Sequence, residues 1–143
     1  MKLDLKKLKL RKVNEKLQNL DRGQNDRDFT IINPEGNHAV CAGLTEEINI
    51  NIKGHVGYYC AGMNQKASVT IDGNVGTGVA ENMMSGKVHV KGNASQSAGA
   101  TAHGGLLIID GDASSRCGIS MKGINIVVKG SVGHMSGFMS QSG

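Results

Sequence analysis

The stretch Val-Thr-Ile-Asp-Gly-Asn-Val-Gly at residues 69–76 contains the pattern that decides the fold. Apolar residues alternate with polar ones up to Gly73, and such alternation predicts a strand with one buried face. A glycine directly after a strand predicts a tight corner that a β-branched residue could not adopt. The second residue after the glycine is apolar again, so the stretch consists of one strand and one corner.

The same pattern recurs along the chain at a spacing of nineteen residues. The corner glycines are Gly54, Gly73, Gly92, Gly111 and Gly130. Four residues and two residues before each of them, the side chain is always Val, Ile or Leu. A fixed period of this length is typical of a solenoid, in which every repeat makes one coil.

Nineteen residues are too few for a strand followed by a crossover helix. The residues between the strands are mostly small and polar, and they show no helical stripe of apolar side chains. We therefore predict an all-β protein, a right-handed parallel β-helix whose equivalent strands stack about 4.8 Å apart. Its composition agrees, since glycine makes up 21 of 143 residues and aromatic residues only 3%.

The outward position before each corner glycine alternates in charge from coil to coil. Its residues are Lys53, Asp72, Lys91, Asp110 and Lys129. Because stacking brings equivalent positions together, like charges would repel and alternating charges can pair. The pattern predicts ion pairs between successive coils, each of them weak because it is exposed.

The N-terminal part of the chain is predicted to be a separate arm. Leu10, Val13, Leu17 and Leu20 form an apolar stripe at three- and four-residue steps, which predicts a helix from about Lys9 to Arg22 with Gly23 as its C-terminal cap. Leu3 and Leu5 fit either a short strand or an extension of this helix. Residues 24–30 read as a linker, so residues 1–30 form the arm and residues 31–143 the β-helix domain. The helix could cover the open end of the solenoid.

Charge and hydropathy argue against two kinds of partner. Residues 1–27 contain nine Lys or Arg and four acids, whereas the rest contains seven and eight. A nucleic-acid surface normally combines basic residues with aromatic ones, so no nucleic-acid binding is expected. No stretch approaches eighteen apolar residues and the helix lacks aromatic anchors, so no membrane association is expected either. We expect a cytoplasmic protein.

The three cysteines, Cys41, Cys60 and Cys117, are separated by multiples of nineteen residues. We therefore predict one inward-facing column, completed by Val79, Ala98 and Ser136, with a degenerate first coil over residues 31–44. Only Cys41 and Cys60 would be close enough to bond. A cytoplasmic chain keeps its thiols reduced, so they are expected to be reduced neighbours.

No other group of residues predicts chemistry. The histidines His38, His55, His89, His103 and His134 occupy different columns without ligand spacing. The glycine-rich runs at 73–78 and 103–105 recur with the coil period, and neither leads from a strand into a helix that could hold a phosphate. We predict no catalytic, cofactor-binding or metal-binding residue.

The pattern at residues 69–76, together with residues 123–133, resembles the glycine-repeat (GXGXG) C-terminal domain of glutamate synthase. The resemblance covers residues 36–143. Residues 133–139, Gly-His-Met-Ser-Gly-Phe-Met, are especially similar to the stand-alone form of this domain, and the segment Val13–Leu17 resembles the one that precedes its coils. Stand-alone subunits accompany a separate glutaminase (amidotransferase) subunit and a separate flavin-containing synthase subunit.

The resemblance implies a right-handed β-helix with a structural role in an oxidoreductase of nitrogen metabolism. FMN, an iron–sulfur cluster and the catalytic cysteine would belong to the partner subunits, and this chain would hold no cofactor. None of its cysteines is at the N-terminus, where the amidotransferase nucleophile of the family lies, so glutaminase activity is not expected. Two alternatives are the subunit of a formylmethanofuran dehydrogenase-type complex that shares the repeat, and a stand-alone ligand-binding module.

The last repeat raises one further expectation. Residues 123–143 contain no polar closing strand after the fifth corner glycine. The sequence is then either a fragment of a longer β-helix or a chain whose C-terminal end is covered. An uncovered end would expose strand edges and apolar side chains. We expect association through this end, with another copy or with a partner subunit.

Overall fold

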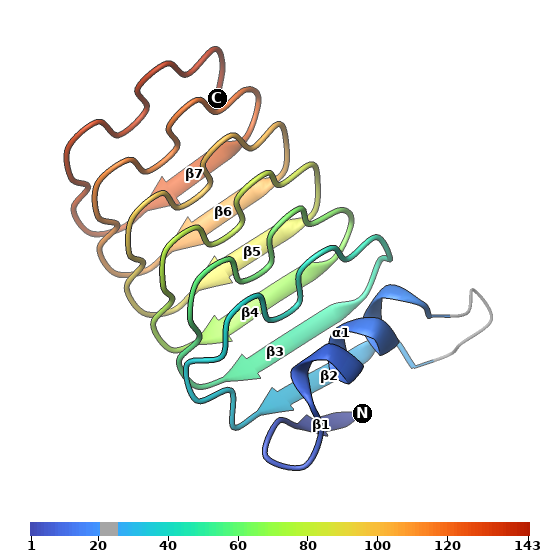
Figure 1. Ribbon diagram of the computed structural model, residues 1–143. Coiled ribbons are helices and arrows are strands. Elements are labelled where there is room, and N and C mark those ends of the chain that lie inside the picture. Colours follow the sequence, from blue (N-terminus) through green and yellow to red (C-terminus); the bar gives the residue numbers. More distant parts are fainter. Residues whose placement is uncertain (21–25) are drawn as a thin grey trace.

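The computed structural model describes residues 1–20 and 26–143, which form a parallel β-solenoid (Figure 1). One sheet contains all the strands of these residues in chain order, and every neighbouring pair is parallel. The strands are β1 (Lys2–Asp4), β2 (Asp28–Ile32), β3 (Asn49–Lys53), β4 (Ser68–Asp72), β5 (Lys87–Val90), β6 (Leu106–Ile109) and β7 (Asn125–Val128). The loops lie in front of the sheet in Figure 1, and the coil winds in the right-handed sense.

The register of the sheet confirms the nineteen-residue coil. Ile52 pairs with Ile71, which pairs in turn with Val90, Ile109 and Val128. The side chains of the first four of these residues are completely buried. A second inward column follows the corner, where single parallel bridges join Val56, Val75, Ala94 and Ala113. Short aliphatic side chains suffice because each coil is thin and is filled by the coils above and below it.

The loops turn without helices because alternate residues take positive φ angles. In one coil these are Tyr59, Ala61 and Met63, at φ of 60°, 55° and 55°. Their backbone groups bond to adjacent coils: the N–H of Tyr59 donates to the carbonyl of Thr77 at 2.8 Å, and the N–H of Ala61 donates to the carbonyl of Val40 at 2.9 Å. Backbone hydrogen bonds between coils thus hold conformations that non-glycine residues adopt at a cost.

The first coil departs from the predicted register. Ile31 pairs with Ile52, an offset of twenty-one residues, and the linker expected over residues 24–30 is wrong at its end because β2 begins at Asp28. Positive φ at both Cys41 and Ala61 places these two residues at the same level. Val40, not Cys41, is therefore level with Cys60. The predicted cysteine column is wrong by one residue in this coil.

The N-terminal segment contains one strand and one helix. Leu3 lies in β1, buried and paired with Ile31, so the structure selects the strand for this end of the chain. Helix α1 (Leu10–Gln18) ends before the predicted Arg22. It ends because the backbone N–H and the side-chain amide of Asn19 both donate to the carbonyl of Glu15, at 3.1 and 2.9 Å. The predicted cap Gly23 and the start of the linker lie outside the described residues, and the division at residue 30 falls within β2.

Candidate interaction surfaces

Helix α1 covers the N-terminal end of the coils, as the sequence suggested. Val13 and Leu17 are buried against the first coil. The side chain of Asn14 donates to the carbonyl of Ala39 and accepts from the N–H of Cys41, both at 2.9 Å. In the next coil the N–H of Ala61, level with Cys41, bonds to the preceding coil instead. Asn14 therefore supplies the bond that a preceding coil would otherwise make.

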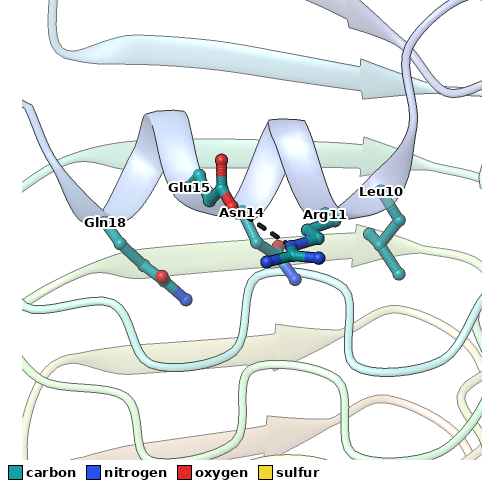
Figure 2. A pocket seen from close by; sticks show the side chains of 5 residues that line it. All are labelled: Leu10, Arg11, Asn14, Glu15 and Gln18. Carbon is teal, nitrogen blue, oxygen red and sulfur yellow. Dashed lines mark hydrogen bonds and ion pairs between the residues drawn. The ribbon is translucent and has the colours of Figure 1, made fainter.

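The other side of α1 faces solvent and is basic. Figure 2 shows a hollow of about 420 Å³ along the helix, lined by Leu10, Arg11, Asn14, Glu15 and Gln18. Arg11 forms an ion pair with Glu15 at 3.2 Å, and Lys12 lies 3.9 Å from the same carboxylate. The amide of Gln18 donates to the carbonyl of Ala42 at 2.7 Å. The hollow is thus bordered by groups that already have partners within the chain.

The outer face of the sheet has a small ionic cluster around Asp110. Its carboxylate accepts a hydrogen bond from His89 Nε2 at 2.9 Å and lies 3.1 Å from Lys129 Nζ. These two partners, the His89 hydrogen bond first, hold the pKa of Asp110 below its ordinary value. Lys53 and Asp72 also pair, at 3.8 Å. Two neighbouring pairs of the predicted charge column are thereby confirmed, and the participation of His89 was not foreseen.

A ladder of side-chain hydrogen bonds runs along the corner after the strands. Each side chain directly after a corner glycine accepts the backbone N–H of the equivalent residue one coil later, at 2.8 to 2.9 Å. The acceptors are His55 Nδ1, Asn74 Oδ1, Asn93 Oδ1 and Asp112 Oδ1, and the last donor is Ser131. The ladder was not predicted, although Asn, Asn and Asp recur at this position and could have indicated it.

The corner glycines permit this ladder by letting the coils approach one another closely. A Cβ added to Gly111 would lie 2.0 Å from Asn93 Oδ1 and 2.8 Å from the carbonyl oxygen of Gly92. A Cβ on Gly92 would meet Asn74 Oδ1 at 2.3 Å. Neither glycine is among the residues at positive φ. The tight corner thus needs glycine for the distance between coils more than for its backbone angles.

The cysteines are free and buried, as the sequence predicted. Burial raises the pKa of Cys60 to about 12. Burial also raises the pKa of Cys41 well above its ordinary value, and the neighbouring Cys60 adds to the increase. The pKa of Cys117 is raised by burial as well. Because the thiolate is the reactive and metal-binding form, these three positions suit packing and not chemistry.

The histidines lie apart and have separate contacts. His38 stacks on Tyr58 with 3.7 Å between ring centroids, and its Nδ1 accepts the backbone N–H of Tyr58. His55 belongs to the corner ladder and His89 to the ionic cluster. Within residues 1–20 and 26–143, no three His, Cys, Asp or Glu side chains form a group that could hold a metal ion. The absence of catalytic, cofactor and metal sites stays a prediction.

The C-terminal face of the solenoid, formed by Ile126, Val128, Val132 and Phe138, is open. Val132 is 53% exposed, whereas the equivalent side chains in preceding coils are at most 7% exposed. Phe138 is 50% exposed, and Ile126 and Val128 are only partly buried. The described chain ends here in apolar columns that no further coil covers. In the same described part, no helix is long and apolar enough to cross a membrane.

Comparison with known proteins gives one partial match. Protein GlxC of Rhizobium meliloti (strain 1021) is 57% identical over 57 residues, which are 40% of this chain and 25% of that protein. The chain therefore spans about a quarter of the length of the curated relative that it matches. No family model and no solved structure matches the chain.

Proposed function

We propose that this chain is a non-catalytic structural subunit of a glutamate synthase-type oxidoreductase. Its partners would be a glutaminase (amidotransferase) subunit and a flavin-containing synthase subunit, which would carry the FMN, the iron–sulfur cluster and the catalytic cysteine. The chain's own part is to present a rigid set of stacked coils on which the partner subunits are fixed relative to each other. Such an assembly would belong to the cytoplasm.

The observation that carries the proposal is the glycine-repeat pattern, whose register the sheet reproduces coil by coil. Its resemblance to the glycine-repeat domain of glutamate synthase supplies the function. The similarity to protein GlxC supports a shared type of coil, because 57 residues are the length of three nineteen-residue repeats. An identity of 57% exceeds what the few apolar and glycine positions of each coil require. Side chains outside the core columns are therefore shared as well, as expected where neighbours dock.

The test is purification of the chain from its native source under mild conditions. The proposal predicts that larger subunits with glutaminase and flavin-dependent synthase activity accompany it, while the isolated chain has neither activity and binds no flavin. Turnover by the isolated chain would contradict the proposal. Co-purification with the other subunits of a formylmethanofuran dehydrogenase would replace it with the alternative assembly. A chain that accompanies no larger protein and binds a small ligand would instead be a stand-alone module.

A further inference from the structure

The exposed side of α1 concentrates positive charge. Residues 1–20 contain seven basic side chains and only two acids, Asp4 and Glu15. Lys9, Lys12 and Lys16 follow one another at three- and four-residue steps, so they lie on one side of the helix, which we call the basic face of α1. All three are exposed. The apolar side of the helix is buried on the first coil, so the basic face is the side that a neighbour could meet.

The start of this helix is poorly designed for stability. Its N-terminal cap residue is Lys9, which makes no side-chain capping bond, and the first turn contains no acid. Arg11 and Lys12 add positive charge where the helix dipole favours negative charge. Lys12 and Lys16 are like charges four residues apart, an unfavourable spacing. Local rules broken together without a gain inside the chain point to a functional site.

Little within the chain compensates these charges. Glu15 is the only acid of α1, and it serves both Arg11 and Lys12. Lys9 and Lys16 form no ion pair with any described residue, although the charge of Lys16 helps to lower the pKa of Asp26. On the outer face of the sheet, by contrast, Lys53 and Lys129 each lie beside an aspartate of the adjacent coil. The chain thus pairs its lysines on the coils and leaves those of the helix available.

We infer that the basic face of α1 docks against an acidic surface of a protein partner in the proposed assembly, so the inference rests on the proposed function. A membrane is a poor occupant because Val13 and Leu17, the residues that would insert, are buried on the coils. A nucleic acid is a poor occupant because residues 1–20 contain no aromatic side chain for base stacking. Leu8, 42% exposed beside the helix, offers the apolar contact that a protein surface can use.

The test reconstitutes the complex from the full chain and the purified glutaminase and synthase subunits. The variant Lys9→Glu/Lys12→Glu/Lys16→Glu should bind about tenfold or more weakly, since it places like charges against the acidic surface. Binding of the wild-type chain should also weaken with added salt, and less so for the variant. The variant Lys9→Arg/Lys12→Arg/Lys16→Arg keeps the charges and should bind as the wild type does. Unchanged thermal unfolding shows that the variants fold.

A matched control reverses three exposed lysines of the coils, Lys66→Glu/Lys87→Glu/Lys122→Glu, with the same change in net charge. This control should bind as the wild type does. Equal weakening by both triple variants would reduce the effect to net charge and overturn the inference. Wild-type binding that the helix variant leaves intact would also overturn it, while the proposed function stands. Failure of the wild-type chain to bind either subunit contradicts the proposed function itself. Binding to a DNA duplex or to phosphatidylserine vesicles that the helix variant alone abolishes would assign the face to that partner instead.

Discussion

The side-chain oxygen of Asn74 accepts a hydrogen bond from the backbone N–H of Asn93 at 2.8 Å, although nineteen residues separate them. The bond lies at the corner, where the backbone has left the sheet and its N–H groups need other acceptors. Asn93 repeats the arrangement with Asp112 in the next coil. A short side chain with an acceptor oxygen is what the position requires, and Asn and Asp both provide it.

Replacement of Asn93 by alanine should remove one step of this ladder. The N–H of Asp112 would lose its acceptor, and because the site is exposed, water can partly replace it. We expect the free energy of unfolding to fall by about 1 kcal/mol. Asn93→Asp should cost less, since Asp112 itself accepts from Ser131 at the equivalent position. Chemical denaturation of both variants measures the difference, and equal losses would show that the acceptor oxygen is not what matters.

Replacement of Gly111 by alanine tests whether the corner needs room between coils. Its new Cβ would lie within 3 Å of atoms of the preceding coil, so the coils must separate locally. We expect a loss of about 2 to 4 kcal/mol. The control Gly36→Ala meets no atom within 4 Å but sits at φ of 73°, and should cost about 1 kcal/mol for its backbone angle. Thermal unfolding should rank the two in this order. The reverse order would make backbone angles the reason for the corner glycines.

The repeat made the central coils predictable. Strand positions, parallel pairing and the inward columns follow from alternation and a fixed period, as the pairing of Ile71 with Val90 shows. Each of these features depends on burial, which a sequence records directly as apolar residues. The pairing of Lys129 with Asp110 was predictable for the same reason, since stacking turns a column of charges into contacts.

The first coil and the site details were less predictable, because they depend on contacts outside the repeat. Nineteen-residue spacing suggested that Cys41 and Cys60 share a column, but the longer first coil shifts Cys41 to the level of Ala61. The end of α1 depends on bonds from Asn19 to Glu15 that periodicity does not record. Asn14 looked like a polar residue on an exposed side, yet it completes the backbone bonding of the first coil.

The buried thiols should make the fold sensitive to alkaline pH. The pKa of Cys60 is about 12 in the folded chain and 9.0 for an ordinary thiol, so above pH 9 the unfolded chain releases a proton that the folded chain keeps. The stability is therefore fully present below pH 9 and falls as pH rises toward 12, by about 1.4 kcal/mol per pH unit for each such thiol.

The variant Cys60→Ala checks this origin, because Ala98 occupies the equivalent place two coils later. Its free energy of unfolding should fall less steeply between pH 9 and 11 than that of the wild type. Below pH 9, native Cys41 and Cys60 should react slowly with thiol reagents, and all three cysteines should react in denaturant. Rapid reaction of Cys60 in the native chain, or parallel pH curves for the two proteins, would contradict the account.

The C-terminal face gives the last prediction, that the chain associates with a second copy through it. Val132 exposes half of a side chain whose equivalents in the other coils are buried, and Phe138 lies exposed in the same coil. Burial of such side chains favours association, and a two-fold contact would bury each of them twice. Val132→Lys should weaken self-association about tenfold or more, because two lysines would then meet across the contact. The fold should persist, since the site is already exposed in the single chain.

Analytical ultracentrifugation over a range of concentrations measures the effect. Met84→Lys is the matched control, because Met84 is apolar and 48% exposed but does not belong to the C-terminal face. It should associate as the wild type does, since solenoid contacts extend mainly to nearest neighbours. A wild-type chain that stays monomeric at high concentration would show that the exposed columns are stable in water. Equal weakening by both variants would place the contact elsewhere on the coils.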